Sequence, residues 1–180
     1  MPRDRLNFWT FSLAVYGNAG VQRECLDLQD RHGINVNLLL FCVFVGAVHG
    51  AVLSQADVEQ ANGVVHVWHE EIVSSLRAAR RALNSFSNDT PSVGVGSLYS
   101  SVKARELEAE ELEQRMLECW GAESLSGWSK TPPSVAVEKN LTALFEVSVE
   151  ESLRPAMPKN LISDALRYAE KLQEGIRCQS

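Results

Sequence analysis

The sequence predicts an all-α fold: a compact core of about four helices, then an acidic helix and two short C-terminal helices at 135–153 and 159–175. Two observations carry this prediction. Apolar residues recur every three or four positions over most of the chain, as expected for helices with one buried face. Residues that typically start or stop helices bracket these stretches. Strand-like alternation is scarce: residues 147–149 are the one tempting case, and Ser148 with Glu151 is more typical of a helix capping box.

The first two helices are predicted from their spacing and their end residues. Trp9, Leu13 and Tyr16 lie at helical spacing and predict a short amphipathic helix. Asn18 is suited to begin a second helix, because an asparagine side chain accepts hydrogen bonds from free N–H groups of the first turn. Gly33 is suited to end that helix, because glycine readily adopts the left-handed conformation common at helix C-termini.

A third helix is predicted between Asn35 and Gly50. It is apolar nearly all round, which is typical of a helix surrounded by other helices. Its unbroken apolar stretch, residues 38–48, is eleven residues long, whereas a bilayer span needs about 20. We therefore expect a buried helix and no membrane association.

A long fourth helix shows the clearest periodicity. Ser54 with Asp57 is typical of a capping box at its start. Its apolar stripe consists of Val58, Ala61, Val65, Trp68, Ile72, Leu76, Ala79 and Leu83. Gly63 interrupts this helix at a cost of about 1 kcal/mol relative to alanine, which predicts the close approach of a neighbouring backbone. Gly46 and Gly50 of the third helix are the expected neighbours.

The chain divides at residues 87–96, whose composition predicts a linker. Residues 5–86 form the expected N-terminal core, and residues 97–180 form a C-terminal helical part that packs on the core as one domain. The acidic helix covers 97–120, and its glutamates are expected to face solvent. Its incomplete apolar seam, which includes Leu112, is suited to pack within the chain or against a second copy.

Composition excludes several classes of function. The formal net charge of −6 and the pI near 5.3 disfavour binding to nucleic acid. The one basic cluster, Arg77, Arg80 and Arg81, is too small for such a surface. The four cysteines are far apart and form no CxxC pair, so zinc ribbons and thioredoxin-like sites are not expected. The N-terminus shows no secretion signal, and we expect a cytoplasmic protein.

No sequence motif predicts catalysis or a cofactor. The nucleophile pattern GxSxG and the zinc pattern HExxH are absent. The short GVG run at 94–96 lacks the preceding strand and the third glycine of a dinucleotide-binding loop. His66, His69 and Glu70 are close in sequence, but at about 100° per residue they face different directions on a helix, so no metal site is expected.

Polar residues intrude on the predicted apolar faces of the second, third and fourth helices. These residues are Gln29, His32, Asn37, Asn62, His69 and Arg80. A buried polar group must be paired or it costs several kcal/mol. One interpretation is a closed structural network in the core. The other is a small pocket between helices that binds a ligand, in which His69 and Arg80 favour an anionic guest.

Several blocks in the first half of the chain carry a resemblance to a known family. They are residues 8–16, 25–33, 35–42, 68 and 76–83. They resemble a family of small, uncharacterised bacterial helical proteins known only as a domain of unknown function. The chain departs from that pattern at Ala19 and at Ser75, where the family has proline. The resemblance implies a small bacterial helical protein and no particular activity.

For function, the sequence favours a non-enzymatic helical interaction or regulatory protein, because it offers apolar helix faces and no catalytic constellation. The expected partner is another protein or a second copy of the chain. The alternative is a module or enzyme that binds an anionic small molecule in the inter-helix polar pocket. Geometry separates the two: side chains that converge on an open cavity favour the alternative, whereas side chains that bond one another in a closed core count against it.

Overall fold

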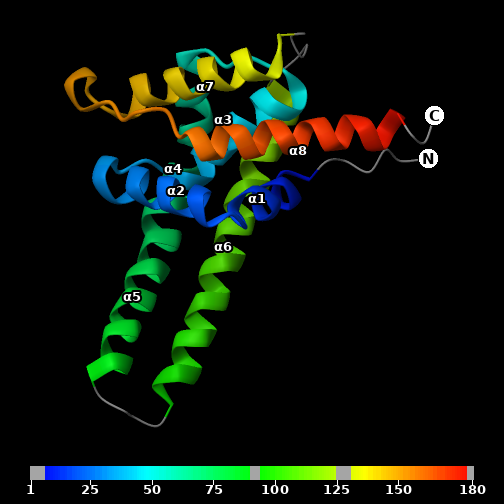
Figure 1. The fold of residues 1–180 in the computed structure, drawn as a ribbon. Coiled ribbons are helices and arrows are strands. Elements are labelled where there is room, and N and C mark those ends of the chain that lie inside the picture. Colours follow the sequence, from blue (N-terminus) through cyan, green and yellow to red (C-terminus); the bar gives the residue numbers. More distant parts are fainter. Residues whose placement is uncertain (1–6, 90–93, 125–130, 178–180) are drawn as a thin grey trace.

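The computed structural model describes residues 7–89, 94–124 and 131–177 (Figure 1). Within these ranges the chain forms helices and contains no strand, which confirms the predicted all-α fold. The α-helices are α1 (Phe8–Tyr16), α2 (Ala19–His32), α3 (Val36–His49), α4 (Gln55–Trp68), α5 (Ser74–Asp89), α6 (Val95–Ser124), α7 (Pro133–Ser148) and α8 (Lys159–Arg177). A π-helical turn, η1 (His69–Val73), joins α4 to α5, and a 3-10 turn, η2 (Glu151–Leu153), precedes α8.

Helix α3 is the centre of the fold. Every residue from Asn37 to Ala47 is buried, because α1, α2, α6, α7 and α8 all pack against this helix. The predicted burial of the third helix is therefore confirmed, and its cover comes from both halves of the chain. In the described ranges, none of the helices combines the length and the apolarity needed to cross a membrane.

The predicted ends of the first helices are confirmed by local hydrogen bonds. Asn18 and Asn35 each accept hydrogen bonds from backbone N–H groups in the first turn of the following helix. Ser54 forms the predicted capping box at the start of α4. Gly33 and Gly50 end α2 and α3 with φ angles of 65° and 64°, a left-handed conformation that favours glycine.

The later elements differ from the prediction at their boundaries. Helix α7 ends at Ser148, and the backbone of Val149 is extended, so the capping box predicted at Ser148 is wrong. Helix α5 continues to Asp89 and α6 begins at Val95, so helical structure extends into the range 87–96 that composition predicts as a linker. In both cases, the local amino-acid composition did not predict where the helix ends or begins.

The predicted close approach at Gly63 is wrong. A Cβ atom added to Gly63 meets nothing within 4 Å, whereas one added to Gly46 lies 2.7 Å from the backbone nitrogen of Val137. The close backbone contact is therefore between α3 and α7, and Gly46 is needed there because even a methyl group collides with the α7 backbone. The spacing of apolar residues shows that a glycine lies on a helix, but it does not identify the neighbouring helix.

Helix α7 is held against the end of α3 by a fully buried asparagine. Asn140 donates hydrogen bonds to the carbonyl oxygens of Cys42 and Ala51, both at 3.0 Å. Its own oxygen accepts from the N–H of Leu53 at 2.7 Å. The bonds to Ala51 and Leu53 satisfy backbone groups in the turn after α3, where helical hydrogen bonding stops, and the bond to Cys42 reaches the middle of α3.

Helices α5 and α6 are arranged differently from the rest. They lie side by side and extend beyond the other helices (Figure 1). The C-terminal part of α6 then continues into the core, where it packs against α1, α3 and α4. This arrangement leaves a cleft between α6 and the helices α1 and α2.

Candidate functional site

The principal candidate site is a cleft of about 760 Å³ between α1, α2, α3, α5 and α6. Three of the six polar residues predicted from the sequence, Gln29, Asn37 and Arg80, line it. They come from three different helices, so the fold brings together side chains that are far apart in the chain. The predicted His32 and Asn62 are half-buried and do not line this cleft.

His69 lies in a closed network beside the cleft. Its Nδ1 atom is 3.1 Å from both carboxylate oxygens of Glu113, whose side chain is completely buried. Glu113 also accepts hydrogen bonds from the side-chain amides of Asn35 at 2.6 Å and Asn37 at 2.8 Å. Because every donor faces the same carboxylate, this part of the predicted polar set forms the satisfied network that buried polar groups require.

The position of His69 depends on the π-helical turn. His69 is the first residue of η1, where the hydrogen-bonding pattern changes from α-helical to π-helical between α4 and α5. From the residue immediately before His69, the indole N–H of Trp68 donates to the carbonyl oxygen of Ala109 at 3.0 Å. These two contacts join the α4–α5 helix to α6 at the level of Glu113.

Arginines of α5 and glutamates of α6 form the charged wall of the cleft. Arg77 donates to Glu106 at 3.3 Å and to Glu110 at 2.8 Å. Arg80 donates twice to Glu106, once at 3.1 Å, and these bonds raise the pKa of Arg80 above its ordinary value. Burial raises the pKa of Glu110, although Arg77 opposes this effect.

The lining of the cleft carries more positive than negative side chains. Its cations are Arg77, Arg80, Arg81 and Lys103, and its carboxylates are Glu106 and Glu110. Arg81 pairs with Asp30 at 3.0 Å on the exposed side of α2. The lining thus has two more cationic than anionic side chains, in contrast to the net charge of −6 of the whole chain, and this local excess favours an anion.

Helices α1 and α6 run antiparallel along the inner end of the cleft. The N–H of Phe8 donates to Glu118 at 3.1 Å. Two turns further along α1, burial raises the pKa of Tyr16 to about 12, and the nearby carboxylate of Glu110 adds to this effect. Phe8, Ser12 and Tyr16 are four positions apart on α1 and so share one face of the helix. Because the flanking residues Phe8 and Tyr16 lie near Glu118 and Glu110 of α6, Ser12 is expected at the level of Gln114, midway between these two glutamates.

Two polar atoms at this inner end have no hydrogen-bond partner among the described residues. They are Oγ of Ser12 and Oε1 of Gln114. Both side chains are only 3 % exposed, and both line the cleft. An unpaired buried polar group costs about 1–3 kcal/mol, so this end of the cleft has hydrogen-bonding capacity that the protein itself does not use.

Apolar side chains complete the lining. They are Trp9, Leu13, Leu26, Val36, Leu40, Ala104 and Leu107. Leu13, Leu26 and Leu107 are exposed although they are large and apolar. The cleft is therefore amphipathic, with apolar surface between its charged wall and its inner polar end.

Sequence reasoning missed Glu106, Glu113 and Gln114, because glutamates of an acidic helix were expected to face solvent. A signal was present. Glu106, Glu110, Glu113 and Leu117 follow one another at helical spacing, and Ala109 and Leu117 on the same side of α6 are buried. A stripe of this kind indicates carboxylates on a packed face, where they need partners from other helices.

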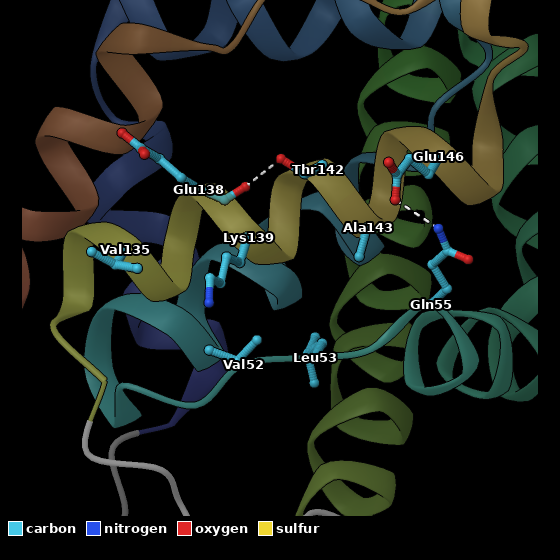
Figure 2. Close-up of a pocket in the computed structure, with 9 residues that line it drawn as sticks. All are labelled: Val52, Leu53, Gln55, Val135, Glu138, Lys139, Thr142, Ala143 and Glu146. Carbon is cyan, nitrogen blue, oxygen red and sulfur yellow. Dashed lines mark hydrogen bonds between the residues drawn. The ribbon is translucent and has the colours of Figure 1, made fainter.

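A second hollow, of about 480 Å³, lies between α7 and the chain at residues 52–55. Three of its polar side chains already bond locally: Gln55 donates to Glu146 at 2.6 Å, and Thr142 donates to the carbonyl oxygen of Glu138 at 2.8 Å (Figure 2). Because it is smaller and, among the described residues, none of its buried polar atoms is unpaired, this hollow is the weaker candidate. In the part of the chain that the structure describes, no group of three or more His, Cys, Asp or Glu side chains is suited to hold a metal ion.

Comparison with known proteins places the cleft within a family. Residues 7–117 match the family described as "Protein of unknown function (DUF2390)". Neither the curated proteins nor the solved structures gave a match. The matched region is more than half of the chain, and it contains every residue that lines the cleft as well as the His69–Glu113 network. The chain thus belongs to the DUF2390 family, as the resemblance in its first half indicates, and the function of that family is unknown.

Proposed function

We propose that this protein binds a small amphipathic anion in the cleft between α1, α2, α3, α5 and α6. The observation that carries the proposal is the combination, in one cleft, of a lining with more cations than carboxylates and two buried polar atoms without a partner. Its volume of about 760 Å³ is within the range of small-molecule sites, which are typically about 300–1,000 Å³.

The arginines are positioned in advance for an anion. Arg77 and Arg80 are each held by carboxylates of α6, which reduces the side-chain entropy lost on binding. A guanidinium group has five N–H donors, and the contacts with Glu106 and Glu110 occupy only part of them. The remaining donors are suited to a carboxylate or phosphate group, which arginine binds in a planar, two-bond geometry.

The apolar lining supports an extended hydrocarbon body on the ligand. Exposed leucines such as Leu13 and Leu107 lose contact with water when such a body fills the cleft. Each buried methylene group contributes about 0.8 kcal/mol. An amphipathic anion therefore uses the apolar and the charged surfaces together, whereas a free inorganic anion uses only the charged one.

Isothermal titration calorimetry and thermal unfolding test the proposal. The probes are dodecanoate, dodecyl phosphate, dodecanol and inorganic phosphate, each below its aggregation concentration. We expect the two amphipathic anions to bind and to raise the melting temperature by mass action, and the other two to bind much more weakly. Absence of binding by both amphipathic anions contradicts the proposal.

A matched pair of variants locates the site. Lys103→Gln removes an exposed cation that lines the cleft, and Lys139→Gln removes an exposed cation on α7 outside it. We expect Lys103→Gln to weaken binding severalfold and Lys139→Gln to leave it unchanged. Equal effects of the two variants would show that binding depends on general charge and not on this cleft.

A second candidate function is the protein interaction that the sequence analysis favours, in the form of self-association. Leu112 of the acidic helix is exposed, which leaves part of the expected seam without a cover in the single chain. Light scattering tests this version: we expect a mass above that of one chain, and a return to the mass of one chain in Leu112→Glu. The same single-chain mass for both proteins contradicts self-association.

A further inference from the structure

The inner end of the cleft has a defined hydrogen-bonding polarity that follows from Glu113. A buried carboxylate accepts hydrogen bonds and donates none. The NH2 group of Asn37 must therefore face Glu113, at 2.8 Å, and the oxygen of Asn37 faces the other way. The orientation of Asn37 is thus dictated by charge, not by an arbitrary assignment of its amide atoms.

The same logic extends one residue further, to the cleft. The oxygen of Asn37 accepts a hydrogen bond from Nε2 of Gln114 at 2.8 Å. Reversing the Gln114 amide would place two oxygens against each other, so its Oε1 atom must be the one left over. This atom has no partner and belongs to a side chain that lines the cleft. At this point of the cleft wall, a buried acceptor atom therefore lacks the donor that it needs.

Ser12 adds a complementary group at the same level. Its hydroxyl group also lacks a partner, and it can either donate or accept. A ligand hydroxyl that donates to Gln114 Oε1 and accepts from Ser12 satisfies both atoms at once. An amide group of the ligand, which has both an N–H and a carbonyl oxygen, satisfies them equally well.

Lys103, the cation at the outer end of the cleft, is too far from the inner polar end for a small ion to reach both, whereas Arg77 lies nearer, beside Glu110. Lys103 and Gln114 lie eleven positions apart on α6, a separation of about 16 Å along the helix axis. Leu107 lines the cleft between them. A ligand that contacts both Lys103 and Gln114 must therefore be elongated, with an apolar middle beside Leu107.

From these observations we infer that the ligand is an elongated amphipathic acid that carries a hydroxyl or amide group at the end opposite its anionic group. Ser12 and Gln114 are the residues that determine this specificity. The inference rests on the proposed function, because it assigns the ligand class for the same cleft. It adds that a plain alkyl acid is a poor match, since its methyl end leaves Gln114 Oε1 buried and unpaired.

Calorimetry with matched pairs of acids tests the inference. The pairs are dodecanoate with ω-hydroxydodecanoate and hexadecanoate with ω-hydroxyhexadecanoate. We expect the hydroxy acid of the better-fitting length to bind at least about tenfold more tightly than its plain counterpart, because only the plain acid leaves a buried acceptor unpaired. Binding of plain and hydroxy acids with equal affinity overturns the inference but leaves the proposed function standing. Absence of binding by all four acids overturns both.

Three serine and glutamine variants assign the preference to the inner end. We expect Ser12→Ala to fold with unchanged or slightly higher stability, because it removes an unpaired group, and to lose much of the preference for the hydroxy acid. Gln114→Leu should reduce the preference for the hydroxy acid more than Ser12→Ala does, although this variant also loses the hydrogen bond to Asn37. The control is Ser85→Ala, on α5 outside the cleft lining, whose hydroxyl group donates to the carbonyl oxygen of Arg81 at 3.3 Å. It should keep the full preference. A preference that persists unchanged in Ser12→Ala overturns the assignment, even if Gln114→Leu fails to fold.

Discussion

The imidazole Nδ1 atom of His69 lies 3.1 Å from both carboxylate oxygens of Glu113, across 44 positions of sequence. This contact joins the π-helical turn after α4 to the middle of α6. The Glu113 carboxylate also fixes the orientation of the side-chain amides of Asn37 and Gln114, which lead from it to the cleft. The stability of the core and the chemistry of the cleft therefore depend on the same buried carboxylate.

Replacing this carboxylate should destabilise the protein strongly. In Glu113→Gln, the NH2 group of the new side chain faces donors from Asn35, Asn37 or His69. We expect a loss of about 3 kcal/mol in the free energy of unfolding, the range found when one partner of a buried charged network is removed. Urea denaturation measures this loss. Glu108→Gln, which removes an exposed ion pair with Arg105, should change stability by less than about 0.5 kcal/mol; similar losses in both variants would contradict the assigned role of Glu113.

Two glycine substitutions should have opposite signs. Gly46→Ala places a methyl group 2.7 Å from the backbone of Val137, and we expect a loss of about 1–3 kcal/mol through overpacking. Gly63→Ala occupies open space on a helix, and we expect a gain of about 0.5–1 kcal/mol. Thermal unfolding of the two variants measures both effects, and a destabilising Gly63→Ala would contradict the packing described for α4.

The raised pKa of Glu110 predicts a pH dependence of stability. A carboxyl group with a folded-state pKa above its unfolded value holds more protons in the folded state, so stability decreases as pH rises through the interval between the two values. For Glu110 this interval begins near the ordinary value of 4.5 and extends upward. We expect the stability difference between Glu110→Gln and the wild type to shift in favour of the variant as pH rises through this interval. Chemical denaturation across this interval measures the difference, and a shift in the opposite direction would show that Arg77 outweighs burial.

His69 and Arg80 should act independently on the stability of the protein without ligand. His69 bonds to Glu113, whereas Arg80 bonds to Glu106, two turns away on α6. We expect the effects of His69→Gln and Arg80→Gln to add within about 0.5 kcal/mol in a double-mutant cycle, as they do for sites without shared partners. A larger coupling in the unliganded protein would show that the closed network and the charged wall of the cleft are one system.

The sequence by itself determined the local structure of this protein. The caps at Asn18, Asn35 and Ser54 and the glycine stops at Gly33 and Gly50 depend on residues within four positions of each other, so their hydrogen bonds can be anticipated from the order of residues alone. The buried third helix follows from its apolar circumference for the same reason. The six predicted polar residues were found because they interrupt apolar stripes, and their role in binding stays a prediction.

Only the tertiary structure decided which of those polar residues meet. It placed Asn37 and His69 on Glu113 and Arg80 on Glu106, although the glutamates of α6 were expected to face solvent. The reason is physical: helical periodicity shows which face of a helix is buried, but a buried carboxylate is stable only if donors from distant segments reach it. Those donors come from helices whose relative positions depend on packing across the whole core, such as the contact of Gly46 with α7. The unpaired atoms of Ser12 and Gln114 are likewise visible only once α1 and α6 lie side by side.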